Sequence, residues 1–129
     1  MGITYIDPGE DGLACVTLTG LATRTEHAVA EERAREDVRA GRLRAILIDA
    51  SEAELPPNPS ISREIWEDFL GVLDARPFAY IPPQGHDSPE RQAMISALLA
   101  EWGSCFRVVG SESEGRAWCL AKLAMLKGE

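Results

Sequence analysis

Cationic residues are scarce in this 129-residue sequence, and they form no patch. There are 13 Lys and Arg residues against 21 Asp and Glu residues, which gives a net charge of −8 at pH 7. The basic residues are interspersed with acidic ones, as in the segment EERARED at 31–37. Binding to nucleic acid and to anionic membranes depends on clustered Lys and Arg. The sequence therefore predicts neither nucleic-acid binding nor attachment to a membrane surface.

Motifs for metal binding and for disulfide formation are also lacking. The three cysteines, Cys15, Cys105 and Cys119, show no CxxC or Cys/His spacing, and the chain has only 2 histidines. A zinc site or a disulfide framework would require such spacing. We expect buried free thiols, no metal and no cofactor. Because reducing compartments keep thiols free, we also expect a cytoplasmic protein.

Long hydrophobic runs are missing as well. The longest, such as AILI at 45–48, have the length of a strand, and residues 1–19 lack the basic start and long apolar run of a signal peptide. We expect no membrane insertion. The length and the hydrophobic fraction of 45% predict one globular domain that spans residues 1–129.

The sequence does contain alternating strand and helix patterns. Two β-prone runs, 3–6 and 14–19, flank a turn rich in Pro and Gly at 7–12, which is typical of a hairpin. The further predicted strands are 43–49, 77–81 and 106–109. Helical patterns follow the second strand and each later one, so the predicted order is β-β-α-β-α-β-α-β-α.

Local signals mark the ends of several helices. Thr23–Glu26 and Ser111–Glu114 both match the capping box that opens a helix, and Ser88-Pro89 is a cap followed by proline. Gly41 is placed to end the first helix in the left-handed conformation. A thin apolar stripe, Ala30, Ala34 and Val38, predicts that this helix lies at the surface.

The element order predicts an α/β fold with an open, mixed sheet. Strands joined through helices are parallel neighbours, whereas the opening hairpin adds one antiparallel edge strand. The continuous apolar run 43–49 predicts a central strand that is buried on both faces. Residues 51–62, with three prolines, are expected to form a loop at the carboxyl end of the sheet, where such folds bind ligands.

Three stretches resemble one family. They are VTLTGLAT at 16–23, LRAILID at 43–49, and RVVG at 107–110 followed by EGRAWCL at 114–120. In this order they resemble the STAS domain superfamily, and within it the SpoIIAA-like proteins of bacteria. The resemblance covers essentially the whole chain and implies a SpoIIAA-like fold.

The same resemblance implies a regulatory role. Relatives include anti-sigma-factor antagonists, which bind a partner kinase and are switched by phosphorylation of a serine at the start of the second helix. The matching stretch, 57–63, makes Ser60 and Ser62 the candidate phosphorylation sites. The Asp and Gly that flank the serine in those proteins are absent here. The chain is therefore closer to the SpoIIAA-like branch, some of whose members are thought to hold small apolar ligands.

Our first hypothesis is a non-enzymatic regulatory or scaffolding domain that binds another protein. The candidate partner-binding residues are Asp49, Glu52, Glu54, Ser60, Ser62 and Arg63. The excess of carboxylates in this region would steer a basic partner by long-range attraction. Alternative explanations are a solvated acidic surface, helix capping by the serines, and hydrogen bonding of Asp49 within its own loop.

The second hypothesis is a binder of a small apolar molecule such as a fatty acid. The molecule would lie in a slot between the second and third helices, lined by Trp66, Phe69, Leu70, Met94 and Leu98. The alternative explanation of these side chains is ordinary packing in the hydrophobic core.

Catalytic residues are not predicted. His86, Asp87 and Ser88 are the residue types of a hydrolase triad, but they are neighbours in sequence and no GxSxG motif is present. Asp49 ends the central strand, as the phosphorylated Asp of a response-regulator receiver domain does. Such domains also require a Lys after the last strand, and this sequence has none there. The other histidine, His27, is expected at the solvated surface. A homodimer through an edge strand or the first helix is a further expectation.

Overall fold

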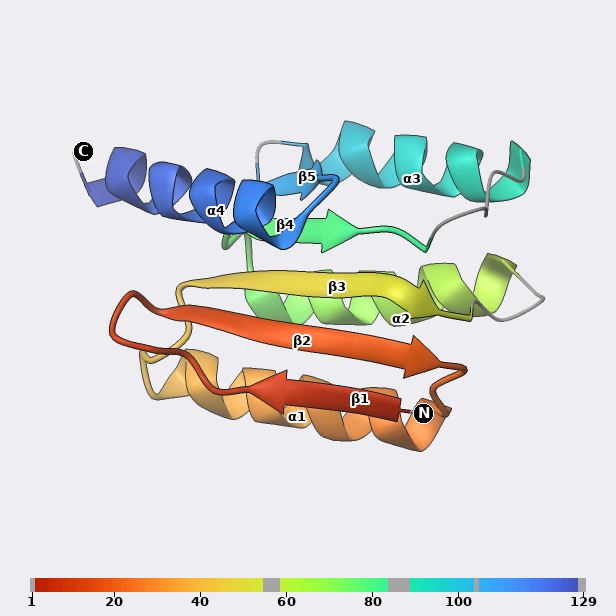
Figure 1. Cartoon of the computed structure of the whole chain (residues 1–129), viewed down its shortest axis with the longest axis horizontal. Coiled ribbons are helices and arrows are strands. Elements are labelled where there is room, and N and C mark those ends of the chain that lie inside the picture. The colour runs from red at the N-terminus through yellow and green to blue at the C-terminus, as the bar shows by residue number, and fades with distance from the viewer. Residues whose placement is uncertain (1, 55–58, 84–88, 104, 128–129) are drawn as a thin grey trace.

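The computed structural model describes the backbone of residues 2–54, 59–83, 89–103 and 105–127, and their side chains except those at 59–63, 90, 91, 94, 126 and 127. Figure 1 shows the nine elements in chain order. They are β1 (Gly2–Ile6), β2 (Leu13–Gly20), α1 (Arg24–Arg39), β3 (Ala45–Ala53), α2 (Pro59–Leu73), β4 (Phe78–Ile81), α3 (Pro89–Trp102), β5 (Phe106–Val108) and α4 (Glu112–Lys127).

The five strands form one sheet in the order β1-β2-β3-β4-β5. β1 pairs with β2 in the antiparallel direction, and each later neighbour pair is parallel. β3 occupies the centre, and Ala45–Ile48 within it are buried. The predicted α/β fold, with its element order, antiparallel edge hairpin and central strand, is confirmed.

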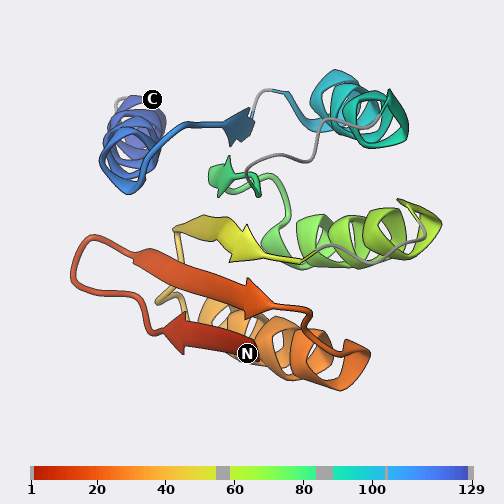
Figure 2. The ribbon, with the colours of Figure 1, turned by 45° about the vertical axis from the view of Figure 1, so that its right-hand side comes forward.

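The strand order determines which face each helix covers. Crossovers between parallel strands are right-handed, so crossovers that advance one strand at a time place their helices on the same face. Figure 2 shows α1, α2 and α3 on one side of the sheet and α4 on the other. The core is split accordingly: Phe78 and Tyr80 pack with α2, whereas Ala79 and Ile81 pack with α4.

The central strand is longer than the sequence predicts. We expected it to end at Asp49, with a loop over 51–62, but β3 continues to Ala53 and α2 begins at Pro59. The prediction of a loop throughout 51–62 is therefore wrong. Pairing with β2 explains the difference, because Thr19 and Gly20 extend the ladder opposite the last residues of β3.

The two predicted capping boxes have structural counterparts, whereas the predicted cap at Ser88 lies outside the described residues. At α1, Glu26 N donates to Thr23 Oγ1 (3.1 Å) and Thr23 N donates to Glu26 Oε1 (3.0 Å), which completes the predicted box. The hydrogen bond from the Thr23 backbone holds the pKa of Glu26 below its usual value. Gly41 follows this helix with a φ of 75°, the predicted left-handed conformation. At α4, Glu114 N donates to Ser111 Oγ (3.2 Å).

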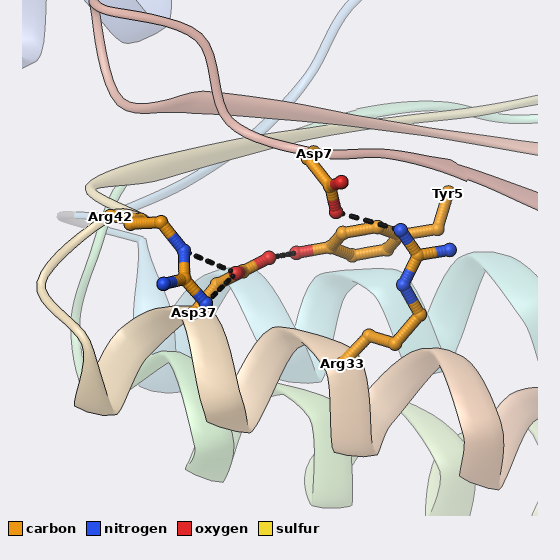
Figure 3. Close-up of polar contacts among 5 residues, drawn as sticks. All are labelled: Tyr5, Asp7, Arg33, Asp37 and Arg42. Carbon is orange, nitrogen blue, oxygen red and sulfur yellow. Dashed lines mark hydrogen bonds and ion pairs between the residues drawn. The ribbon is translucent and has the colours of Figure 1, made fainter.

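A polar network that the sequence did not reveal joins the opening hairpin to α1 (Figure 3). The Tyr5 hydroxyl donates to Asp37 Oδ2 (2.8 Å), and Arg42 Nε donates to Asp37 Oδ1 (3.0 Å). Arg33 lies 4.5 Å from the centre of the Tyr5 ring and pairs with Asp7 at 2.7 Å. Asp37 is 5% exposed, so these donors are the partners that a buried carboxylate needs. Burial, followed by the bond to Asp37, raises the pKa of Tyr5.

We predict that Tyr5→Phe lowers the free energy of unfolding by about 1.5–3 kcal/mol, because it removes a hydrogen bond to a buried charged group. Urea denaturation measures the change. Asp7→Asn, which removes only the exposed ion pair with Arg33, is the control and should cost less than about 1 kcal/mol. Equal effects of the two substitutions would contradict the structural role of the Asp37 contact.

A second prediction concerns Gly115, which lets α4 approach the sheet closely. A Cβ at Gly115 would lie 2.5 Å from Leu47 Cδ1 and 3.2 Å from Val109 Cγ2. Gly115→Ala should therefore lower the free energy of unfolding by about 1–3 kcal/mol through overpacking. The same change at Gly71, on the exposed side of α2 with no atom within 4 Å, should raise it by about 0.5–1 kcal/mol. Thermal or urea unfolding in which both substitutions stabilise the chain would refute the close contact.

Candidate functional site

The parallel strands β2 to β5 end at one edge of the sheet, and we call this edge the carboxyl edge. Figure 1 shows that α1 and α2 also begin there. The described residues that follow the strands at this edge include Leu21, Ala22, Glu54, Pro82 and Gly110. Open α/β sheets bind their ligands at this edge, which makes it the first place to look for a site.

A cavity of about 70 Å³ opens at the carboxyl edge between α1, α2 and the sheet. Its walls are mainly apolar. They include Val16 and Ile48 from the sheet, Ala30 from α1, and Trp66 and Phe69 from α2. Sites for small or apolar groups are typically concave and mostly apolar with a few polar groups. The cavity has that composition.

Small side chains account for the empty space. The cavity is lined by Ala22 from the loop before α1, by Ala30 from α1 and by Ala53 from β3. Their methyl side chains do not reach far into it. Ala53 arrives there through an irregularity in the ladder: between Asp49 and Glu52 β3 has one more residue than the matching stretch of β2. This bulge lets Ala50 and Ala53 both join the core on the α1–α3 face.

His27 is the titratable residue of α1 that lines this cavity. It is half-buried, so the prediction of a solvated surface histidine is wrong. Burial lowers the pKa of His27 below the usual 6.5, and the neighbouring Glu26 opposes the shift. The helical spacing of α1 did not reveal this burial, because the other residues that line the cavity with His27 come mostly from the sheet, α2 and the loop after β2.

The predicted acidic residues are divided between two places. Asp49 is half-buried on the face opposite the cavity, and its Oδ1 accepts bonds from Ser51 N (3.0 Å) and Ser51 Oγ (2.6 Å). Glu52 and Glu54 are exposed, and Glu54 also lines the cavity. The backbone of Glu54 is fixed by a bond from its N–H to Gly20 O (2.8 Å).

Ser60, Ser62 and Arg63 lie at the start of α2, which the structure places at the carboxyl edge. Their side chains fall outside the described part of the chain, so their roles in phosphorylation and partner binding stay predictions. One residue further on, Glu64 pairs with Arg24 at 2.7 Å. This exposed ion pair links the beginnings of α1 and α2 beside the cavity.

Four residues of the predicted apolar slot, Trp66, Phe69, Leu70 and Leu98, belong to one hydrophobic core cluster. Trp66 and Phe69 line the cavity between α1 and α2, which is the other side of α2 from the predicted slot. Leu70 and Leu98 are buried in the core at 1% and 3% exposure. The side chain of Met94 is not described. The slot between α2 and α3 stays a prediction.

The cysteines offer no activated nucleophile. Cys105 and Cys119 are buried free thiols, as predicted, whereas Cys15 is half-buried. Burial raises the pKa of all three, to about 12 for Cys119, so the reactive thiolate form is disfavoured. Among the described residues, no three His, Cys, Asp or Glu side chains gather to hold a metal ion. His86, Asp87 and Ser88 lie outside the described residues.

The described helices are also too short or too polar to cross a membrane. No protein-family model and no curated protein matches the sequence significantly. Similarity to solved structures is clear, however, and it extends over nearly the whole chain.

The anti-sigma factor antagonist SpoIIAA in its unphosphorylated form aligns with a TM-score of 0.61 and 8% identity, over 90% of this chain and 94% of SpoIIAA. The Bacillus cell fate determinant SpoIIAA in its phosphorylated form gives 0.59 and 10%, over 88% and 97%. An anti-sigma factor antagonist from Mycobacterium paratuberculosis gives 0.59 and 19%, over 92% and 94%. The chain therefore has a SpoIIAA-like fold, as the sequence predicted.

The burial of His27 predicts a pH effect on stability. Because the folded-state pKa lies below 6.5, the unfolded chain binds the proton more readily, and stability is lost as the pH falls from about 6.5 through the folded-state pKa. His27→Gln should reduce the loss in free energy of unfolding between about pH 7.5 and about pH 5. Chemical denaturation of wild type and His27→Gln at both pH values measures this loss, and His86 is present in both proteins. Identical losses in both chains would contradict the burial of His27.

Proposed function

We propose that the chain is a non-enzymatic regulatory or scaffolding domain that acts by binding another protein at the carboxyl edge. The observation that carries this proposal is an apolar cavity lined by the exposed Glu54, with the exposed Glu52 two residues earlier at the end of β3. Interfaces typically combine an apolar centre with a polar rim. Two of the similar structures are anti-sigma factor antagonists, which supports a protein partner.

The charge of this edge favours a basic partner. Glu52 lies near the end of β3 and Glu54 directly follows that strand, whereas Arg24 is already paired with Glu64. A net charge of −8 would add long-range attraction for a cationic surface and repel nucleic acid. Electrostatic attraction of this kind raises the association rate and disfavours acidic partners.

The start of α2 extends the proposed surface to Ser60, Ser62 and Arg63. A phosphate on either serine would be stabilised by the helix N-terminus and would add negative charge next to the partner site. We therefore propose that phosphorylation at this place alters partner binding. We further propose that residues 1–129 act as one domain in a bacterial cytoplasm, where the free thiols stay reduced.

Two alternatives have their own tests. A second copy of the chain could be the partner, through the edge of β1 or through α1, and light scattering after size exclusion would reveal the dimer. A small apolar ligand is favoured by the apolar cavity, although the predicted site for it is the slot between α2 and α3. Native mass spectrometry of the freshly purified chain would detect such a ligand as added mass.

We predict that a charge reversal at the carboxyl edge prevents partner capture. The tagged chain is used to capture proteins from source-cell lysate, and quantitative mass spectrometry compares wild type with the double variant Glu52→Lys/Glu54→Lys. A specific partner should decrease about ten-fold or more, because the variant replaces attraction by repulsion.

The matched control is Glu36→Lys/Glu101→Lys, which changes the net charge equally at exposed positions near the ends of α1 and α3. This control should capture the partner as wild type does. If both double variants lose the partner equally, net charge alone governs binding and the carboxyl edge is not the site. If wild type captures no specific partner at low salt, the proposed function is wrong.

A further inference from the structure

We propose that the cavity between α1 and α2 is a socket for one branched aliphatic side chain, Leu, Ile or Val, carried by a basic segment of the partner protein. This inference rests on the proposed function and deepens it, because it states how the partner would be recognised at the carboxyl edge. The size of the cavity, its rigid wall and the charges around its mouth support this occupant.

The size of the cavity limits what it can hold. An apolar cavity of about 150 Å³ in a protein interior accommodates benzene. The present cavity measures about 70 Å³, roughly half of that. A branched aliphatic group is of the right size, whereas an aromatic ring or the chain of a fatty acid is too large. Because the cavity opens at the surface, a side chain presented by another protein can reach it.

The wall formed by α2 is held in place by aromatic contacts. The Trp66 ring meets Tyr80 edge-on at 4.3 Å between ring centres, and it lies 5.3 Å from Phe78 and 5.8 Å from Phe106. Phe78 and Phe106 are almost fully buried. These contacts prevent the Trp66 side chain from turning into the cavity. A preformed pocket spares the partner the cost of ordering it, and anchoring side chains at interfaces fill pockets of this kind.

The mouth of the cavity combines apolar surface with negative charge. Leu21, which is 43% exposed, and Glu54 both line it, and the exposed Glu52 precedes Glu54 by two residues. Arg24, an exposed cation at the start of α1, is paired with Glu64 at 2.7 Å. Burial lowers the pKa of His27 and so disfavours its cationic form. Lys or Arg residues flanking the inserted side chain would therefore meet carboxylates.

Panning a random peptide library displayed on phage against the full chain tests the socket. We expect the enriched peptides to share an aliphatic residue flanked by Lys or Arg. Synthetic peptides from this selection should bind at least about ten-fold more weakly when the aliphatic residue is changed to Ala, since burial of that side chain is lost.

Two variants fill the socket from the protein side. Ala53→Leu replaces a methyl group on the wall by an isobutyl group, and Ala22→Leu does the same from the loop before α1. Both should weaken peptide binding about ten-fold or more. Thermal unfolding checks that each variant is folded. If Ala53→Leu does not fold, Ala22→Leu alone tests the filled cavity. Ala117→Leu, at an exposed position of α4 on the other face, should leave binding unchanged.

The outcomes separate the socket from the proposed function. Peptides whose binding ignores both filling variants overturn the socket, and so does a selection that yields no binding peptide. In either case the lysate capture described above, with its dependence on Glu52 and Glu54, still decides the proposed function. A small apolar molecule that copurifies with wild type and is lost in Ala53→Leu would also overturn the socket, because the cavity would then hold a ligand and not a side chain of the partner.

Discussion

Parallel pairing of consecutive strands is the constraint from which the rest of the structure follows. Each parallel neighbour from β2 to β5 requires a crossover, and right-handed crossovers in one direction bring α1, α2 and α3 to the same face. The starts of α1 and α2 then meet the carboxyl ends of β2 and β3. Any site formed by these two helices is thereby placed at an exposed edge.

Side-chain size then decides what this edge contains. The buried apolar side chains of α1 are the small residues Ala30 and Ala34, whereas α2 contributes the large side chains of Trp66 and Phe69. Between α1 and α2, the small lining residues Ala22, Ala30 and Ala53 leave a cavity. The cavity thus results from packing a helix with small buried side chains beside a helix with large ones. The carboxylate that lines it, Glu54, directly follows β3.

Local patterns were sufficient to predict the fold but not the site. The hairpin, the capping box at Thr23 and the strand order depend on residues close in sequence and on general rules of connection. The length of β3 depends on its ladder with β2, and the burial of His27 and the bond between Tyr5 and Asp37 depend on contacts across elements. The cavity depends on the separation of α1 and α2, which no periodicity encodes. The acidic residues were predicted, yet their division between two faces required the structure.

A crystal of the chain under xenon pressure gives the most direct measurement of the preformed cavity, because xenon enters apolar cavities without needing a partner. The account predicts a xenon atom between Ala30, Ala53 and Trp66, with the Trp66 ring still against Tyr80. A crystal in which this space takes up no xenon and is filled by a rotated Trp66 side chain would contradict the account.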